Sequence, residues 1–273
     1  MSDPSTRHLS WLKDFTHYPV TGDVIFEIPL SGPELALALG VVLAASAVTG
    51  LVGFGMGMVV SPILLLVLDP QSVVTTINSL SILVLAMVGV RARHDLPVAR
   101  VLPLALAGLL AVPIGVLILS TASPGPMRIA IASLVLVLAI PSVLRVQRPL
   151  PWARVLGPLI GFLGAMMVTG MGVGVPLVAL FLVNQGWSAR SIRASIAVYY
   201  LFVGLEAVVL YAATGLYTLE RLSLTLALAP GAVLGFGLAS LLMRRINDRV
   251  LRYIVMVVII AASLGLLLRE LAG

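Results

Sequence analysis

The chain has 273 residues, of which 60% are hydrophobic and only 10% are charged, and its formal net charge is +6. Soluble domains carry about 25% charged residues, so this composition excludes a soluble protein and indicates one that crosses a membrane several times. The arginines lie in short loops between apolar runs, without a basic tract interleaved with aromatics, and we therefore expect no nucleic-acid partner. The sequence contains no cysteine, which excludes disulfides and thiolate metal sites.

Residues 1–33 form a polar N-terminal extension whose first residues are too acidic for a signal peptide. Leu9, Trp11, Leu12 and Phe15 favour a short amphipathic helix on the membrane surface. Disorder explains the same residues equally well, and the sequence leaves both alternatives open.

Eight apolar segments follow the extension. Six have the length of roughly 20 residues that a membrane-spanning helix needs. The other two are longer, and each contains a glycine cluster, GFGMG at 53–57 or GMGVG at 170–174. The eight segments are 35–68, 72–90, 98–119, 127–144, 155–183, 194–213, 219–242 and 250–268.

The order of these segments repeats, with a long glycine-broken segment followed by three ordinary ones in each half. A shift of 117 residues superposes the three glycines of the two clusters and also places Pro113 on Pro230. The pattern predicts a duplication, with a first transmembrane repeat at 34–144 and a second at 155–269. The basic segment 145–154 links them.

The positions of the basic residues predict the topology. If each broken segment enters and leaves on the same face, twelve of the seventeen basic residues share one face, whereas ten do so if it crosses. The positive-inside rule favours the first arrangement. Each half then makes three crossings, so the halves lie upside down to each other. We expect an all-α polytopic membrane protein of two inverted repeats, each a re-entrant helical hairpin plus three spanning helices.

The glycine clusters predict where a ligand binds. The arm 175–183 reaches roughly 14 Å as a helix, about half the hydrocarbon core, so the chain turns near the middle of the membrane. Each following helix presents its N-terminus, which suits an anion. Packing of small residues in GxxxG motifs is the alternative explanation. The predicted binding residues of the clusters are Gly53, Gly55, Gly57, Gly170, Gly172 and Gly174.

The two clusters with their following arms, GFGMGMVVSPILLL and GMGVGVPLVALFL, resemble the sulfite exporter TauE/SafE-like family (TSUP) of bacterial membrane permeases. The resemblance covers about residues 36–268, although Met56 and Val173 stand where glycine is common in the family. It implies a secondary transporter in the bacterial cytoplasmic (inner) membrane, with the linker 145–154 in the cytoplasm. The implied substrate is a sulfur-containing anion such as sulfite or an organosulfonate, moved as an export reaction.

Polar residues in the spanning segments extend the predicted site. Asn78 and Ser195 are equivalent under the repeat, and Tyr199 lies one helical turn after Ser195. We expect these three side chains to face a central cavity and to hold oxyanion oxygens. Serine and threonine also bond to carbonyl oxygens of their own helix, which leaves a structural explanation open.

Two charged residues have predicted roles in transport. Glu206 lies inside the segment 194–213, where a carboxylate is costly and marks a functional site by default. It is the predicted proton-coupling group, unless it reaches the interface or pairs with a loop arginine. Arg193 is predicted to attract anions at the mouth of the cavity or to act in gating, unless it is only a positive-inside anchor.

Other classes of function fit the sequence less well. An intramembrane enzyme needs a histidine or paired carboxylates in the membrane, whereas His8, His17 and His94 all lie outside the apolar segments. We expect no enzyme activity, no cofactor and no metal. A carrier for another small organic or inorganic anion remains an alternative, as does a membrane accessory or assembly protein that transports nothing. The expected partners are a small anion and the lipid bilayer, and the sequence leaves open whether the chain forms a homodimer.

Overall fold

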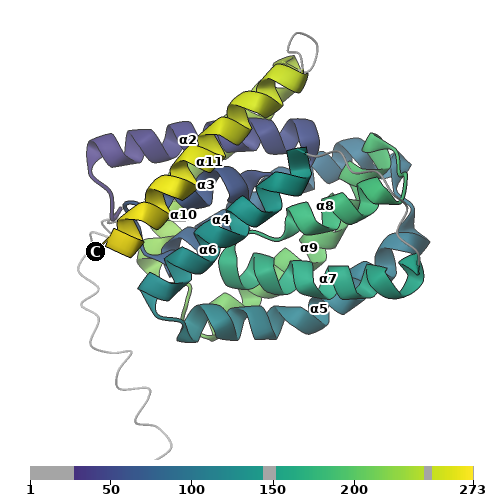
Figure 1. The fold of residues 1–273 in the computed structure, drawn as a ribbon, viewed down its shortest axis with the longest axis horizontal. Coiled ribbons are helices and arrows are strands. Elements are labelled where there is room, and N and C mark those ends of the chain that lie inside the picture. The colour runs from purple at the N-terminus through teal and green to yellow at the C-terminus, as the bar shows by residue number, and fades with distance from the viewer. Residues whose placement is uncertain (1–27, 144–151, 243–247, 273) are drawn as a thin grey trace, which may run out of the picture.

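The computed structural model describes residues 28–143, 152–242 and 248–272, and in these ranges the regular structure is entirely helical (Figure 1). Most of the N-terminal extension and of the linker 145–154 lies outside the described residues. The all-α prediction is confirmed. The helices are α2 (Gly32–Val52), α3 (Met56–Leu64), α4 (Pro70–Ala92), η3 (Arg93–Asp95), α5 (Val98–Thr121), α6 (Pro124–Val143), α7 (Ala153–Met171), α8 (Val175–Asn184), α9 (Ala189–Ala213), α10 (Leu219–Leu242) and α11 (Asp248–Ala272).

Both long apolar segments break at their glycine clusters, as the sequence predicted. Between α2 and α3, Gly53 has a φ angle of 93° and Gly55 one of 124°. Between α7 and α8, Gly172 has a φ angle of 73°. A residue with a Cβ atom adopts such positive φ angles only at a cost, so glycine ends the helix at these positions.

Five of the described helices are long and apolar enough to cross a membrane, namely α2, α4, α5, α9 and α10. The chain is therefore a multi-pass membrane protein. Among these five, α4 has the largest buried share, 61%, and lies at the centre of the fold. Helix α2 has 21 residues, about 31 Å at the helical rise, so the first break lies deeper than a turn at mid-membrane would place it.

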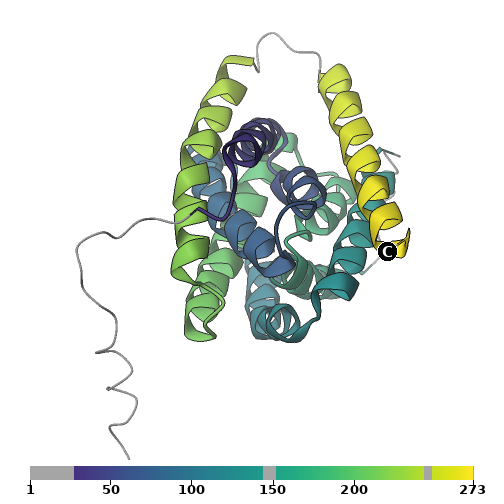
Figure 2. The same cartoon turned by 90° about the vertical axis from the view of Figure 1, so that its left-hand side faces the viewer.

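Several contacts between helices occur in matching pairs in the two halves. The predicted repeat aligns α2 with α7 and α5 with α10. Helix α5 packs on α7, and its repeat-related contact, α10 on α2, is also present. The equivalent helices α4 and α9 pack on each other, as do α6 and α11. Figure 2 shows α2 and α3 between α10 and α11, so the first broken segment is held mainly by helices of the second half.

Neighbouring residues give the directions of the packed helices. Gly161 lies against Leu104 and Gly115 against Thr169, so α5 and α7 are parallel. The α2 and α10 pair is also parallel, because Leu39 lies beside Gly231 and Gly50 beside Phe236.

Helices α4 and α9 are antiparallel, since Gly89 lies beside Ala197 whereas Asn78 bonds to Tyr211. Arg128, at the start of α6, bonds to Glu270 at the end of α11. Helices α4 and α10 are parallel, as contacts from Arg221 to Ser72 and from Thr225 to Thr76 show. Helix α5 runs opposite to α4, so α2, α4 and α10 run in one direction and α5, α7 and α9 run in the other. Helices α2, α4 and α5 therefore run opposite to their counterparts α7, α9 and α10.

Most helices run roughly along the horizontal axis of Figure 1, with α6 and α11 oblique, and the two ends of this bundle differ in charge. At one end, here called the basic face, α4 ends and α7, α9 and α11 begin. The other end, the ion-pair face, carries Arg128 bonded to Glu270 at 3.0 Å and Arg221 bonded to Asp69 at 3.3 Å. Among the residues whose side chains are described, the basic face has Arg91, Arg93, Arg100, Arg190 and Arg193 against Asp95.

Because the chain has no cysteine, single introduced cysteines report the face on which they lie. We expect Ala99→Cys and Ala189→Cys to react with an impermeant maleimide from one side of the membrane. Ser123→Cys and Thr214→Cys should react only from the other side, and all four positions are exposed. Labelling of Ala99→Cys and Thr214→Cys from the same side would contradict the helix directions.

Candidate functional site

The two glycine breaks touch each other through their backbones. A Cβ atom on Gly57, in the first turn of α3, would overlap the carbonyl oxygen of Gly172. A Cβ atom on Gly174 would likewise overlap the carbonyl oxygen of Gly164. Glycine is therefore required at Gly57 and Gly174 by the close approach of other backbone, which no side chain can relieve by changing its rotamer.

Each glycine break lies beyond the other along the membrane normal, the first nearer the basic face and the second nearer the ion-pair face. Gly53 lies against the side chain of Arg193, in the second turn of α9 at the basic face. Gly172 lies against Val74, in the second turn of α4 near the ion-pair face. The two broken segments therefore overlap along the membrane normal, and their facing portions enclose the site.

A small buried cavity of about 20 Å³, the volume open to the centre of a water molecule, lies between the breaks. Roughly 10–15 Å³ of such volume holds one water, so an anion with four non-hydrogen atoms needs the cavity to widen. Ser81 and Tyr200 place it near the middle of α4 and α9. The lining residues are Thr49, Phe54, Gly55, Met56, Gly57, Met58, Ser81, Leu85, Gly172, Val173, Gly174, Val175, Pro176 and Tyr200.

The first turn of α3 offers more hydrogen-bond donors to the cavity than that of α8. The first backbone bond of α3 runs from Val59 N to Gly55 O at 3.1 Å, which leaves the N–H groups of Met56, Gly57 and Met58 unused. In α8, Pro176 has no N–H, and Leu177 N already donates to Gly174 O at 3.0 Å. Of the two N–H groups of Val175 and Leu177, that of Val175 has no backbone partner within the described residues.

Behind the cavity wall lies a buried hydrogen-bond network centred on Asn78. The Tyr200 hydroxyl donates to Asn78 Oδ1 at 2.5 Å, and Asn78 Nδ2 donates to Tyr211 Oη at 2.8 Å and to Val168 O at 3.0 Å. Tyr211 donates in turn to Thr169 O at 2.5 Å. The network thus joins α4 and α9 to the last turn of α7.

The structure divides the predicted binding residues into two groups. Gly55, Gly57, Gly172 and Gly174 line the cavity, whereas Gly53 and Gly170 flank it. The three predicted polar side chains, Asn78, Ser195 and Tyr199, are buried but do not line the cavity. Tyr199 donates to Gly161 O at 2.6 Å, Asn78 belongs to the network, and the Ser195 hydroxyl has no hydrogen-bond partner among the described residues.

Several lining residues were missed from the sequence. Tyr200 follows Tyr199 directly, but only Tyr199 was selected, because it lies one helical turn after Ser195. Ser81 lies three residues after Asn78 and was not among the predicted binding residues, although it lines the cavity. Nothing in the spacing distinguishes Phe54, Met56 and Met58 from core residues, because they occupy a turn whose direction the sequence does not give.

Arg193 and Glu206 lie away from the cavity. Arg193 Nη1 donates to Leu51 O at 3.0 Å and so holds the last turn of α2. Glu206 is half-buried in α9, and its Oε2 atom is buried without a hydrogen-bond partner among the described residues. Within those residues, no three histidine, aspartate or glutamate side chains converge as a metal site would require.

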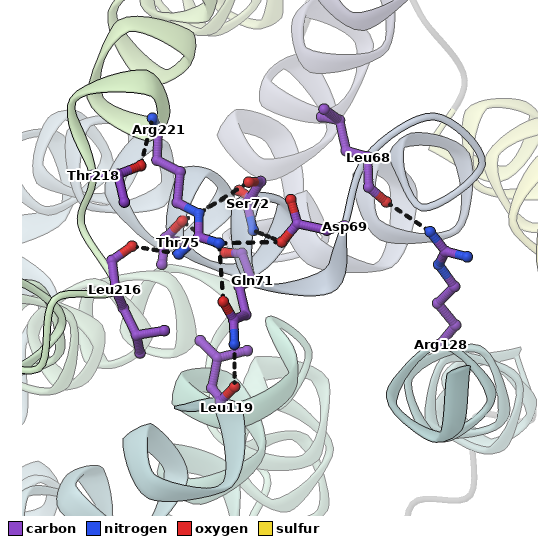
Figure 3. Close-up of polar contacts among 10 residues, drawn as sticks. All are labelled: Leu68, Asp69, Gln71, Ser72, Thr75, Leu119, Arg128, Leu216, Thr218 and Arg221. Carbon is purple, nitrogen blue, oxygen red and sulfur yellow. Dashed lines mark hydrogen bonds and ion pairs between the residues drawn. The ribbon is translucent and has the colours of Figure 1, made fainter. Parts of the chain in front are cut away.

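A second polar cluster closes the ion-pair face around Arg221, at the start of α10 (Figure 3). Arg221 Nε donates to Ser72 Oγ at 3.0 Å, and its Nη2 donates to Gln71 Oε1 at 2.9 Å and lies 3.3 Å from Asp69 Oδ2. Gln71 Nε2 donates to Leu119 O at 3.2 Å, at the end of α5. One arginine of the second half thus ties together two helix ends of the first.

The fold and site define a polytopic α-helical membrane protein in which two discontinuous helices, one from each half, meet at a buried cavity. The family model described as sulfite exporter TauE/SafE matches residues 37–266, and the chain belongs to this family, a family of membrane transporters. This confirms the resemblance found in the sequence. No curated protein matches the chain, and no solved structure does.

The contact between the breaks gives a direct test. We expect Gly57→Ala to lower the free energy of unfolding by about 2 kcal/mol, because its methyl group overlaps the Gly172 carbonyl oxygen. Gly40→Ala in α2 is the matched control, since a Cβ atom there has no neighbour within 4 Å. Thermal unfolding in detergent measures both. Equal midpoints for the two variants would contradict the close approach.

Proposed function

We propose that this protein is a secondary transporter that exports a small sulfur-containing anion, such as sulfite or an organosulfonate, across the inner membrane. The observation that carries the proposal is the meeting of two broken helices at a buried cavity, with the N-terminus of a short helix on each side. Transporter sites have this arrangement, near the midplane and between repeats. The substrate class comes from the family, which is described as a sulfite exporter family.

The cavity suits an anion held by partial charges. Its lining contains no charged side chain. The favourable potential therefore comes from the helix N-termini and from the unused N–H groups of Met56, Gly57 and Met58, with one more from Val175. Because α3 supplies three of these donors, we place the oxygen atoms of the anion nearer to α3 than to α8. The apolar side chains of Phe54 and Leu85 leave room for a small organic substituent once the cavity widens.

The helix directions support two inverted repeats, with the basic face in the cytoplasm. Transport then opens the cavity to each face in turn, which requires the contacts between the halves at that face to separate. At the ion-pair face these are the contacts of Arg221 with α4 and of Arg128 with Glu270. At the basic face they include Arg193 on Leu51 O and the guanidinium of Arg91, 4.3 Å from the ring centre of Phe236.

The test of this function is sulfite flux in proteoliposomes. We expect saturable uptake by the unmodified chain, and a loss of at least tenfold in Gly172→Val, since a β-branched residue at a φ angle of 73° displaces the second break. Gly265→Val is the control, because a Cβ atom at Gly265 has no neighbour within 4 Å. Both variants must first elute as folded protein.

The outcomes separate the candidate functions. Flux of another anion with no flux of sulfite would keep the transporter and reject the substrate. Binding and flux of no anion by folded protein would favour the accessory or assembly protein.

Glu206 is the proposed proton-coupling group, because a buried carboxylate oxygen without a partner is suited to carry a proton. We expect Glu206→Gln, which keeps the shape of the side chain, to remove the dependence of sulfite flux on an imposed pH gradient. Counterflow at equal pH on both sides should continue. Gradient-driven flux equal to that of the unmodified chain would exclude the proton role.

A further inference from the structure

Asn78, Tyr200 and Tyr211 connect the cavity to the end of α7. We propose that these three are positioning residues: they fix the second glycine break against the cavity instead of binding the substrate through their polar atoms. The inference rests on the proposed function only in taking the cavity as the substrate site. The fixing of the second break by a neutral, buried hydrogen-bond network does not depend on the proposed function.

The hydrogen-bonding capacity of Asn78 is already used. A primary amide has two donor hydrogens, and the Nδ2 atom of Asn78 donates one to Val168 O and one to Tyr211 Oη. Its Oδ1 atom accepts from Tyr200. The amide therefore has no hydrogen left for an anion. The Tyr200 hydroxyl donates its single hydrogen to Asn78, so it also has no hydrogen left to donate to an anion.

The acceptors of the network are two carbonyl oxygens in the last turn of α7, of which Val168 O also accepts from Gly172 N at 2.8 Å. The last four C=O groups of a helix have no partner within it. Val168 and Thr169 belong to the last turn of α7, which ends at Met171, and their oxygens accept from Asn78 and Tyr211. Asn78 comes from the first half and Tyr211 from the second. Residues of both halves thus determine where α7 ends and where the turn over Gly172 begins.

Burial makes this arrangement costly to disturb. Asn78 and Tyr211 are 0% exposed and Tyr200 is 2% exposed. A polar group that loses its partner in such surroundings pays its full desolvation cost, because no water replaces the lost bond. The bonds also strengthen one another in a low dielectric. The second break is therefore held firmly in one position.

The first break lacks this network. The counterpart of Asn78 under the repeat is Ser195, whose hydroxyl has no hydrogen-bond partner among the described residues. The last turn of α2 is held by Arg193 on Leu51 O, and Arg193 is only half-buried. A half-buried cation exchanges more readily with water than a buried amide does. We therefore expect the first break to move more easily than the second.

Cysteine accessibility tests this difference. Val173→Cys places a thiol in the second break and Phe54→Cys places one in the first, and both positions line the cavity. We expect Tyr211→Phe, which removes the bond to Thr169 O, to raise the reaction rate of the thiol at position 173 about tenfold and to leave that at position 54 within twofold. Arg193→Ala should do the reverse. A general loss of stability would raise both rates in both variants.

Two further measurements control the test. Tyr217→Phe removes a hydroxyl that donates to Ser79 Oγ, outside the network and the cavity lining, so the thiol at position 173 should react within twofold of its original rate. If Tyr211→Phe does not fold, hydrogen exchange of the unmodified chain replaces it. The amides of Thr169–Met171 should then exchange at least tenfold more slowly than those of Val52–Phe54. Equal exchange of the two segments, or equal labelling at positions 54 and 173, would overturn the proposal.

Transport measurements separate this inference from the proposed function. Tyr200→Phe and Tyr211→Phe should lower the affinity for sulfite by similar factors, because both act through the position of the second break. A much larger loss in Tyr200→Phe would show that its hydroxyl binds the anion and would overturn its positioning role. If sulfite does not bind the unmodified chain but the labelling pattern holds, the proposed substrate fails and the positioning network stands.

Discussion

The structure depends on one constraint: backbone that leaves the helical path inside a membrane must find its hydrogen-bond partners within the protein. Two such departures occur, at Gly53–Gly55 and at Gly172–Gly174. Their carbonyl groups are satisfied by side chains from other helices, by Arg193 at the first break and by Asn78 and Tyr211 at the second. The N–H groups at the starts of α3 and α8 are left for the cavity. The same constraint that demands partners for the carbonyls thus creates the donors of the candidate site.

The pairing of helices across the halves follows from the same need. Neither broken segment can bury its turn against its own half alone, so α2 packs on α10 and α7 on α5. Small residues allow this close packing: a Cβ atom on Gly161 would overlap the backbone of Leu104, and one on Gly235 would overlap that of Leu43. These packing glycines lie outside the two clusters, so close helix packing and the glycine turns occur at different positions of the same segments or their neighbours. Packing brings the halves together, and the turns then face each other.

The sequence predicted the helices well because their signals are local. Four of the six segments predicted to span, those of α4, α5, α9 and α10, are among the five described helices long and apolar enough to cross, and the segment 219–242 has the bounds of α10. Positive φ angles require glycine, so the clusters revealed both breaks. The cavity walls were harder to predict, because which side of α9 faces inward depends on contacts with α4 and α7. Tyr200 and Tyr211 owe their roles to partners 122 and 42 residues away. No periodicity within α9 contains that information.

The two breaks have similar surroundings but are held by different side chains. Each lies beside a helix of the other half, α9 for the first break and α4 for the second. A charged, half-buried arginine holds one helix end, and a neutral, buried amide holds the other. A charged group tolerates water during a conformational change, whereas a buried amide does not. A pair of identical breaks would be equally mobile. Different side chains at the two helix ends are the simplest way for two similar turns to take different parts in one transport cycle.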